Sequence, residues 1–314
     1  MFGIKGIVPT LILNSTITLL FSWYFSKKIN IKYINVNNKI VYKEGKGLLQ
    51  LGIAMSVSGI LVYFSAYILR SFIRMEGGVE AVGLFTAGFT LMTTYAGLVF
   101  NAMSTDYFPR LAAVNNDNAK CREIMNQQAE IGLLILAPLM AICIIFIPIV
   151  VRALYSTKFL DANNYIIWCA VGMLFKLSSW SVAFIFVAKG ESKVFMINEI
   201  VSGVYTLVLN LLGYYFGGLT GLGIAFFVGY FIYTIHVYVE SRLWYDFSFS
   251  TEFVKMFALQ FILVSACIIV LYVASSIVIK YTVGSVLVLV SAFYSLRGLD
   301  EKLGLRNIIH KKKR

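Results

Sequence analysis

Residues 189–225 read KGESKVFMINEIVSGVYTLVLNLLGYYFGGLTGLGIA, and this stretch decides how the rest of the chain is interpreted. It opens with a short polar turn, continues as the apolar run 194–216 and, after Gly217 and Gly218, enters a second apolar run. About 20 helical residues cross a hydrocarbon core of roughly 30 Å, so the first run is long enough to span a membrane. Glycine pairs allow tight turns, and Gly221 and Gly223 let a neighbouring helix approach closely. The stretch therefore predicts two membrane helices joined as a tight hairpin.

The composition extends this prediction to the whole chain. Of 314 residues, 59% are hydrophobic and only 13% are charged, and the mean hydropathy is +0.81. Soluble domains average about 25% charged residues, so the chain is expected to be a polytopic membrane protein. The net charge of +12 does not indicate nucleic acid as a partner, because most basic residues lie in loops between apolar runs, as the positive-inside rule requires. The four cysteines form no CxxC pair, so neither a disulfide framework nor a zinc site is indicated.

Nine apolar runs have the length of a membrane span, which predicts an all-α bundle of about nine transmembrane helices. They are Gly6–Phe25, Leu48–Leu69, Val82–Met103, Ile131–Val151, Tyr165–Val187, Val194–Phe216, Leu219–Tyr238, Phe253–Ala274 and Thr282–Leu296. The loop 27–46 is rich in lysine and is assigned to the cytoplasm, which by alternation places the N-terminus of this chain outside and the C-terminus inside. Three parts are expected: residues 1–47 with one span and the basic loop, a six-helix bundle over 48–238, and the last two spans with a basic tail over 239–314.

The segment from Asp106 to Glu130 is expected to be one of the two longest connections between spans. Cys121, Ile124 and Met125 would share one face of a helix, which favours either a helix lying on the cytoplasmic surface or a solvated extension of the next span. Both interpretations stay open at this point.

Several local patterns resemble one known family. They are Gly83–Gly88 leading to the aromatic-Pro-Arg sequence at Tyr107–Leu111, the short loop Leu154–Phe159, and the opening stretch with its later glycines. In order and spacing they resemble polysaccharide (O-antigen type) flippases of the multidrug/oligosaccharidyl-lipid/polysaccharide exporter superfamily, and the resemblance covers almost the whole chain.

The resemblance implies a transporter rather than an enzyme. It would flip an undecaprenyl-pyrophosphate-linked oligosaccharide across the bacterial inner membrane during O-antigen or lipopolysaccharide biosynthesis, by alternating access. Family members usually have 12 or 14 spans in two lobes around a central cavity, so about five N-terminal helices are expected to be missing here. A truncated or split remnant, a drug/cation antiporter of the same superfamily and a membrane glycosyltransferase or polymerase remain as alternatives.

Lys176 is the first candidate site residue, because it lies near the middle of its predicted span. A charge at that depth costs about 2.5 to 3.5 kcal/mol on insertion scales, so it needs a partner or a water-filled cavity. In a cavity the lysine would attract a pyrophosphate or an acidic sugar; alternatively it pairs with a neighbouring helix. Glu199 is expected either to pair with Lys176, to bind a coupling proton, or to reach the membrane interface. Asn198 would bind substrate or join helices by hydrogen bonds.

The other candidates lie near the ends of spans. Arg70 and Arg74 would receive a phosphate at the outer end of the second span or anchor it at the interface. Asn101, Asp106 and Arg110 surround the inner end of the third span, where Asp106 and Arg110 would form an i, i+4 pair unless Pro109 disturbs the helix.

No catalytic residue, metal site or cofactor is expected, and His236 and His310 are isolated in the sequence. Coupling by H⁺ or Na⁺ is left open. The expected partners are the lipid-linked oligosaccharide, anionic membrane lipids that bind the terminal basic residues Lys311–Arg314, and other polysaccharide-assembly membrane proteins.

Overall fold

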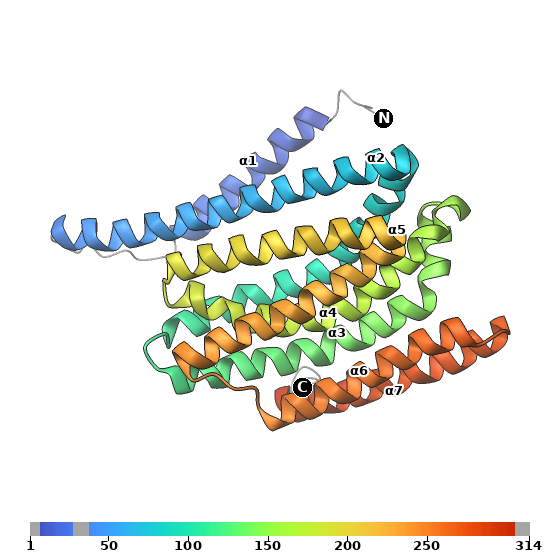
Figure 1. The fold of residues 1–314 in the computed structure, drawn as a ribbon. Coiled ribbons are helices and arrows are strands. Elements are labelled where there is room, and N and C mark those ends of the chain that lie inside the picture. The colour runs from blue at the N-terminus through green and yellow to red at the C-terminus, as the bar shows by residue number, and fades with distance from the viewer. Residues whose placement is uncertain (1–6, 28–37, 305–314) are drawn as a thin grey trace. The chain divides into compact units, whose positions relative to one another are not determined.

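The computed structural model describes residues 7–27 and 38–304, and these residues are almost entirely helical (Figure 1). The chain forms two compact units, Met1–Gly47 and Leu48–Arg314. The first contains α1 (Ile7–Ser26), which covers nearly the residues of the first expected span. Much of the basic loop after it, and the basic tail with His310, lie outside the described residues. The all-α membrane bundle predicted from the sequence is confirmed.

The remaining helices follow one another with short connections. They are α2 (Asn38–Ala113), α3 (Asn118–Leu154), the 3₁₀ helix η2 (Thr157–Ala162), α4 (Asn163–Ala188), α5 (Ser192–Tyr245), α6 (Thr251–Val273) and α7 (Ile277–Leu303). Within the described residues, six helices between residues 45 and 303 are long and apolar enough to cross a membrane. The chain is therefore a multi-pass membrane protein, while the count of nine spans stays a prediction.

Two of these helices bend back on themselves at a glycine. Gly78 in α2 has φ 76° and ψ −175°, and Gly218 in α5 has φ 55° and ψ −140°, backbone angles that residues with a side chain rarely adopt. The arms of α5 then touch: a Cβ added to Gly221 would lie 2.0 Å from the carbonyl oxygen of Gly213. The tight glycine hairpin expected in residues 189–225 is confirmed.

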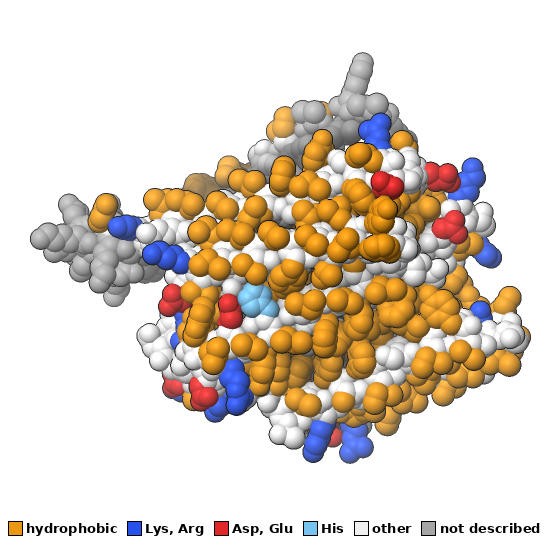
Figure 2. All heavy atoms as spheres, in the orientation of Figure 1, with side chains coloured by type: hydrophobic (Ala, Val, Ile, Leu, Met, Phe, Trp, Pro, Cys, Tyr) orange, Lys and Arg blue, Asp and Glu red, His pale blue; other side chains and the backbone are white. Residues whose placement is uncertain are grey.

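The unit from residue 48 has two ends, which we name by their connections. The kink end carries Gly78, Gly218 and the connections 155–162 and 274–276, and the turn end carries the connections 114–117, 189–191 and 246–250. On the face shown in Figure 2, hydrophobic side chains cover the middle of this unit and charged side chains gather toward its helix ends. Such a belt is what a lipid-facing surface requires.

The core of this unit surrounds α4, most of whose residues are buried. Phe175 makes edge-to-face contacts with Phe227, Phe231, Phe257 and Phe261 at centroid distances of 5.1 to 5.6 Å, which joins α4 to α5 and α6. Between membrane helices, association depends on such close packing rather than on the exclusion of water.

The connection between α2 and α3 corrects one expectation. Only residues 114–117 leave helical structure, so the long connection expected from Asp106 to Glu130 is wrong. Residues 118–130 are the first turns of α3, not a separate surface helix, and their inner face is buried: Cys121 and Met125 pack in a second core with Tyr107 and Leu111. Of the two interpretations left open, the structure shows the extension of the next span, with its apolar face buried rather than solvated.

Asp117 begins α3. Its carboxylate accepts hydrogen bonds from the backbone amides of Ala119 and Lys120, both at 3.1 Å. The bond from the Lys120 amide is the main cause that lowers the pKa of this carboxyl below its ordinary value, because it stabilises the charged form.

The last two helices pack on α3. A Cβ on Gly284 or Gly298 would meet the side chain of Ile145 or Leu134 at 2.6 to 3.0 Å, so glycine lets α7 approach α3 closely. Between α6 and α7, the buried Gln260 side chain bonds with Ser291 and Ser295.

Candidate functional site

Lys176 lies in α4 among buried neighbours and is itself half-buried. Its Nζ sits 5.7 Å from the ring centroid of Phe100 in α2 and 5.2 Å from that of Tyr230 in α5. Within the described residues no carboxylate approaches Nζ closely enough for an ion pair. The ring faces attract the ammonium group without neutralising it, so its charge is available to an anion.

Glu199 does not pair with Lys176, and that expectation is wrong. Its carboxylate instead accepts a hydrogen bond from the hydroxyl of Ser58, 2.5 Å away, which belongs to the first arm of α2. Ser58 is buried and Glu199 is half-buried, so the carboxylate faces into the unit. The sequence could not reveal this contact, because Glu199 and Lys176 lie on different helices and the sequence does not show which helix faces meet.

Asn198 is 3% exposed and donates a hydrogen bond from its side-chain amide to Oε2 of Glu240 in the second arm of α5. This is the helix-joining role that was one of the two expectations for Asn198. It also introduces Glu240, an acidic residue that the sequence reasoning did not single out.

His236 faces the other oxygen of the same carboxylate. Its Nε2 lies 3.3 Å from Oε1 of Glu240, and the two side chains are only 22% and 21% exposed. The rings of Tyr205 and Tyr233 lie 6.3 and 6.2 Å from the imidazole. His236 was read as isolated, although the i, i+4 spacing to Glu240 on a helix was a signal that could have found the pair.

A continuous series of contacts connects this pair to Lys176. Tyr230, which packs against Lys176, is 6.5 Å from Tyr233, and Tyr233 is in turn next to His236. The lysine in α4 and the polar group on α5 thus belong to one cluster. We call it the Lys176–Glu240 cluster; it consists of Lys176, Asn198, Glu199, Tyr205, Tyr230, Tyr233, His236 and Glu240.

Arg70 and Arg74 differ in their environment. Arg70 is half-buried, and its guanidinium carbon lies 6.0 and 5.9 Å from the ring centroids of Phe85 and Phe89. Arg74 is exposed near the kink end. Only Arg70 therefore faces the packed interior. It lies near Gly78, at the kink end, and is not part of the Lys176–Glu240 cluster.

The three residues near the end of α2 lie outside the cluster. Asn101 is exposed, and Asp106 and Arg110 form the expected i, i+4 ion pair at 3.1 Å. Pro109 does not end the helix, which continues to Ala113. Arg110 also donates a hydrogen bond to the side chain of Gln127 in α3, and this bond connects α2 with α3.

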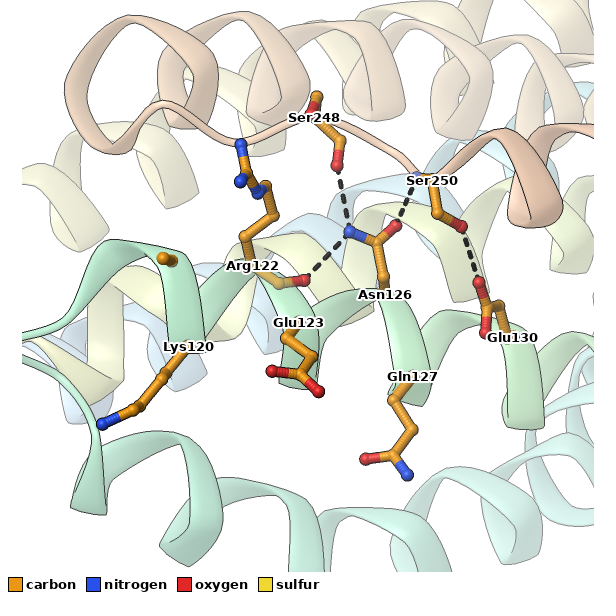
Figure 3. Close-up of a pocket in the computed structure, with 9 residues that line it drawn as sticks. Lys120, Arg122, Glu123, Asn126, Gln127, Glu130, Ser248 and Ser250 are labelled. Atoms are coloured by element: carbon orange, nitrogen blue, oxygen red, sulfur yellow. Dashed lines mark hydrogen bonds between the residues drawn. The ribbon is translucent and has the colours of Figure 1, made fainter. Parts of the chain in front are cut away.

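A polar pocket of about 630 Å³ opens at the turn end, beside α3 and the loop 246–250. Figure 3 shows Asn126 between Ser248 and Ser250, with its amide bonded to both, and Ser250 donating to Glu130. Lys302 of α7 reaches the other oxygen of Glu130 at 2.6 Å. These polar groups therefore satisfy one another and connect α3 with α7 and the loop 246–250.

Comparison with known sequences decides the family. Residues 1–164, more than half of the chain, match the model of the family described as "Polysaccharide biosynthesis protein". The chain belongs to this family. Comparison with curated protein sequences gives no significant match.

Solved structures with a similar fold are membrane transporters. The lipid II flippase MurJ in its inward closed conformation superposes with a TM-score of 0.53 at 14% identity, over 91% of this chain and 60% of the flippase. A MOP superfamily transporter from Pyrococcus furiosus (TM-score 0.48, 16% identity, 82% of this chain and 66% of that one) and a MATE family multidrug transporter (0.49, 15%, 83% and 67%) are also similar. This polysaccharide biosynthesis protein has a membrane fold similar to that of MurJ and spans about 60% of the length of MurJ.

Proposed function

We propose that this chain is a transporter that flips a lipid-linked oligosaccharide of the undecaprenyl-pyrophosphate type across the bacterial cytoplasmic membrane, by alternating access. Its family and its MurJ-like fold support the transport of a polysaccharide precursor. The observation that carries the proposal is Lys176, a charged side chain held within the bundle between two aromatic rings and without a carboxylate partner among the described residues.

The chemistry of the substrate fits this lysine. A pyrophosphate linkage carries negative charge that must cross the bilayer while the lipid tail stays in it. A half-buried ammonium lowers that cost, since electrostatic attraction is stronger where water is scarce. Lysine suits an anion that binds only in passing, because its ammonium group is a point charge on a flexible side chain, whereas the guanidinium of arginine is a rigid, bidentate donor. Arg70, nearer the kink end, is the second cation that the anion would meet.

A drug/cation antiporter is the second candidate function. The carboxylates of Glu199 and Glu240 favour it, since both are half-buried in the same cluster and would attract a cationic drug. Each, however, already has a hydrogen-bonding partner, whereas Lys176 has ring faces only. We therefore favour an anionic substrate. The proposed orientation places the turn end in the cytoplasm, in agreement with its basic residues.

Substitution of Lys176 tests the proposal in cells that require this protein for surface glycan. Lys176→Ala should reduce glycan export at least about tenfold, because a charge-assisted contact of roughly 1.5 to 3 kcal/mol is lost. Lys176→Arg should keep a measurable part of the export, since it retains the charge. Glycan on intact cells is measured by a lectin or an antibody, and membrane insertion by immunoblotting of membrane fractions.

The matched control is Lys193→Ala, which removes an exposed lysine at the start of α5 and should leave export unchanged. Normal export by a correctly inserted Lys176→Ala variant would refute the role of this lysine. Loss of resistance to cationic drugs, with unchanged glycan export, would instead favour the antiporter.

A further inference from the structure

His236 and Glu240 form a titratable pair near the end of α5 whose side chains are largely shielded from solvent. Each side chain is about four-fifths buried, and the pair spans one turn of α5. Ordinary surface pairs at this spacing, such as Arg297 with Glu301, are 74% and 66% exposed. Placing two such groups out of water in an apolar helix costs free energy, and ionisable residues in such positions are usually functional.

The environment of the pair keeps Glu240 in place in either charge state of the histidine. The amide of Asn198 donates to Oε2, so this carboxylate has a partner that cannot titrate. Because an ionised carboxylate only accepts hydrogen bonds, the Nε2 atom that faces Oε1 is the nitrogen that carries hydrogen. The proton that His236 gains or loses is then the one on Nδ1.

A second unusual group lies beside the imidazole. The hydroxyl oxygen of Tyr205 is buried and has no hydrogen-bonding partner, and its ring is 6.3 Å from that of His236. An unpartnered buried hydroxyl costs free energy unless a proton, a water molecule or another polar group meets it during function. The other titratable and charged groups that face this region are Glu199 and Tyr233 on α5, and Tyr230 with Lys176 of α4 beyond it.

We propose that His236 and Glu240 form a proton-binding site, with Nδ1 of His236 as the atom that takes up the proton, linked to Lys176 through Tyr233 and Tyr230. The proposal rests on the proposed function in one respect only, namely that Lys176 meets an anionic substrate. An anion bound at Lys176 adds negative charge to this cluster, and added negative charge stabilises the protonated imidazole. Proton uptake would then accompany loading of the substrate.

Nuclear magnetic resonance of the ¹⁵N-histidine-labelled full chain in lipid nanodiscs tests the site without any transport assay. The chain has two histidines, so His310→Gln leaves a single imidazole to assign. At pH about 8.5 the neutral ring should be the Nε2–H tautomer, and on acidification to about 5.5 the Nδ1 signal should move to the protonated position. Glu240→Ala should remove the tautomer preference.

The control is Glu301→Ala, which removes the carboxylate of the exposed pair on α7 and should leave both the tautomer and the pH of the change as they are. If Glu240→Ala does not fold, Glu240→Asp shortens the same side chain and should weaken the tautomer preference. An imidazole that does not change between these pH values, or a tautomer that is the same with and without the Glu240 carboxylate, would overturn the proposal.

Addition of undecaprenyl pyrophosphate tests the link to Lys176. The His236 signal should move in the wild-type chain and stay in place in Lys176→Ala. A His236 signal that does not move on addition of the lipid in either chain would refute the link between His236 and Lys176. A titrating, Glu240-dependent His236 in a chain that flips no lipid would leave the proton site standing and refute the proposed function, so the two failures are distinguishable.

Discussion

At the scale of single residues, the structure separates side chains that bind one another from those that remain available. Lys302 and Glu130 illustrate the first kind, since Glu130 is 6% exposed and accepts from both Lys302 and Ser250. Removal of one partner of a buried pair leaves a charge without compensation. Lys302→Met should therefore lower the free energy of unfolding by about 3 kcal/mol. The double variant Glu130→Gln with Lys302→Met should recover most of this loss, as measured by thermal unfolding in detergent.

The comparison is Arg297→Ala, which breaks an exposed pair on the same helix and should change stability by less than about 0.5 kcal/mol. Equal losses in Lys302→Met and Arg297→Ala would contradict the role assigned to Glu130.

The same scale shows what sequence can and cannot reveal about a site. Lys176 stands out in the sequence because a lysine in the middle of a span is rare, and the structure places it half-buried in α4. Pairing with Glu199, one of three alternatives for that residue, does not occur, because the sequence does not tell which faces of separate helices meet. His236 and Glu240 were missed for a different reason: their spacing is a local signal, but they lie near a helix end where charged residues usually face water.

At the scale of elements, the α5 hairpin depends on the absence of side chains where its arms cross. Gly221→Ala should destabilise the chain by about 1 to 3 kcal/mol, because the added methyl group would overlap the backbone of Gly213. Gly203→Ala, on the same helix with open space at its Cβ position, should be neutral or slightly stabilising. Thermal unfolding of both variants measures the difference, and a tolerant Gly221 would show that the arms do not pack as described.

Element boundaries were predicted unevenly. The glycine hairpin in α5 was clear because apolar runs and a glycine pair mark its parts directly. The α2–α3 connection was misjudged, since the polar residues after Met103 continue the helix to Ala113 rather than forming a loop. Helices that extend beyond the hydrocarbon core carry polar residues, so hydropathy locates the membrane span and not the end of the helix.

At the scale of the whole molecule, composition and span length were enough to predict an all-α membrane bundle, because a polypeptide within a lipid bilayer must satisfy its backbone groups internally. The arrangement of α4 in the centre could not be predicted, since it depends on packing between distant segments. The MurJ-like fold and the family agree with the resemblance, whereas the substrate is a proposal that rests on Lys176 and its surroundings.

The most direct test is a flipping assay in proteoliposomes that contain this chain and a fluorescent undecaprenyl-pyrophosphate oligosaccharide. Our account predicts that the chain accelerates movement of the lipid between leaflets, and that Lys176→Ala reduces this acceleration at least about tenfold while Lys193→Ala does not. Flipping that is equally fast in the wild-type and Lys176→Ala chains, or no acceleration by the folded wild-type chain, would contradict it.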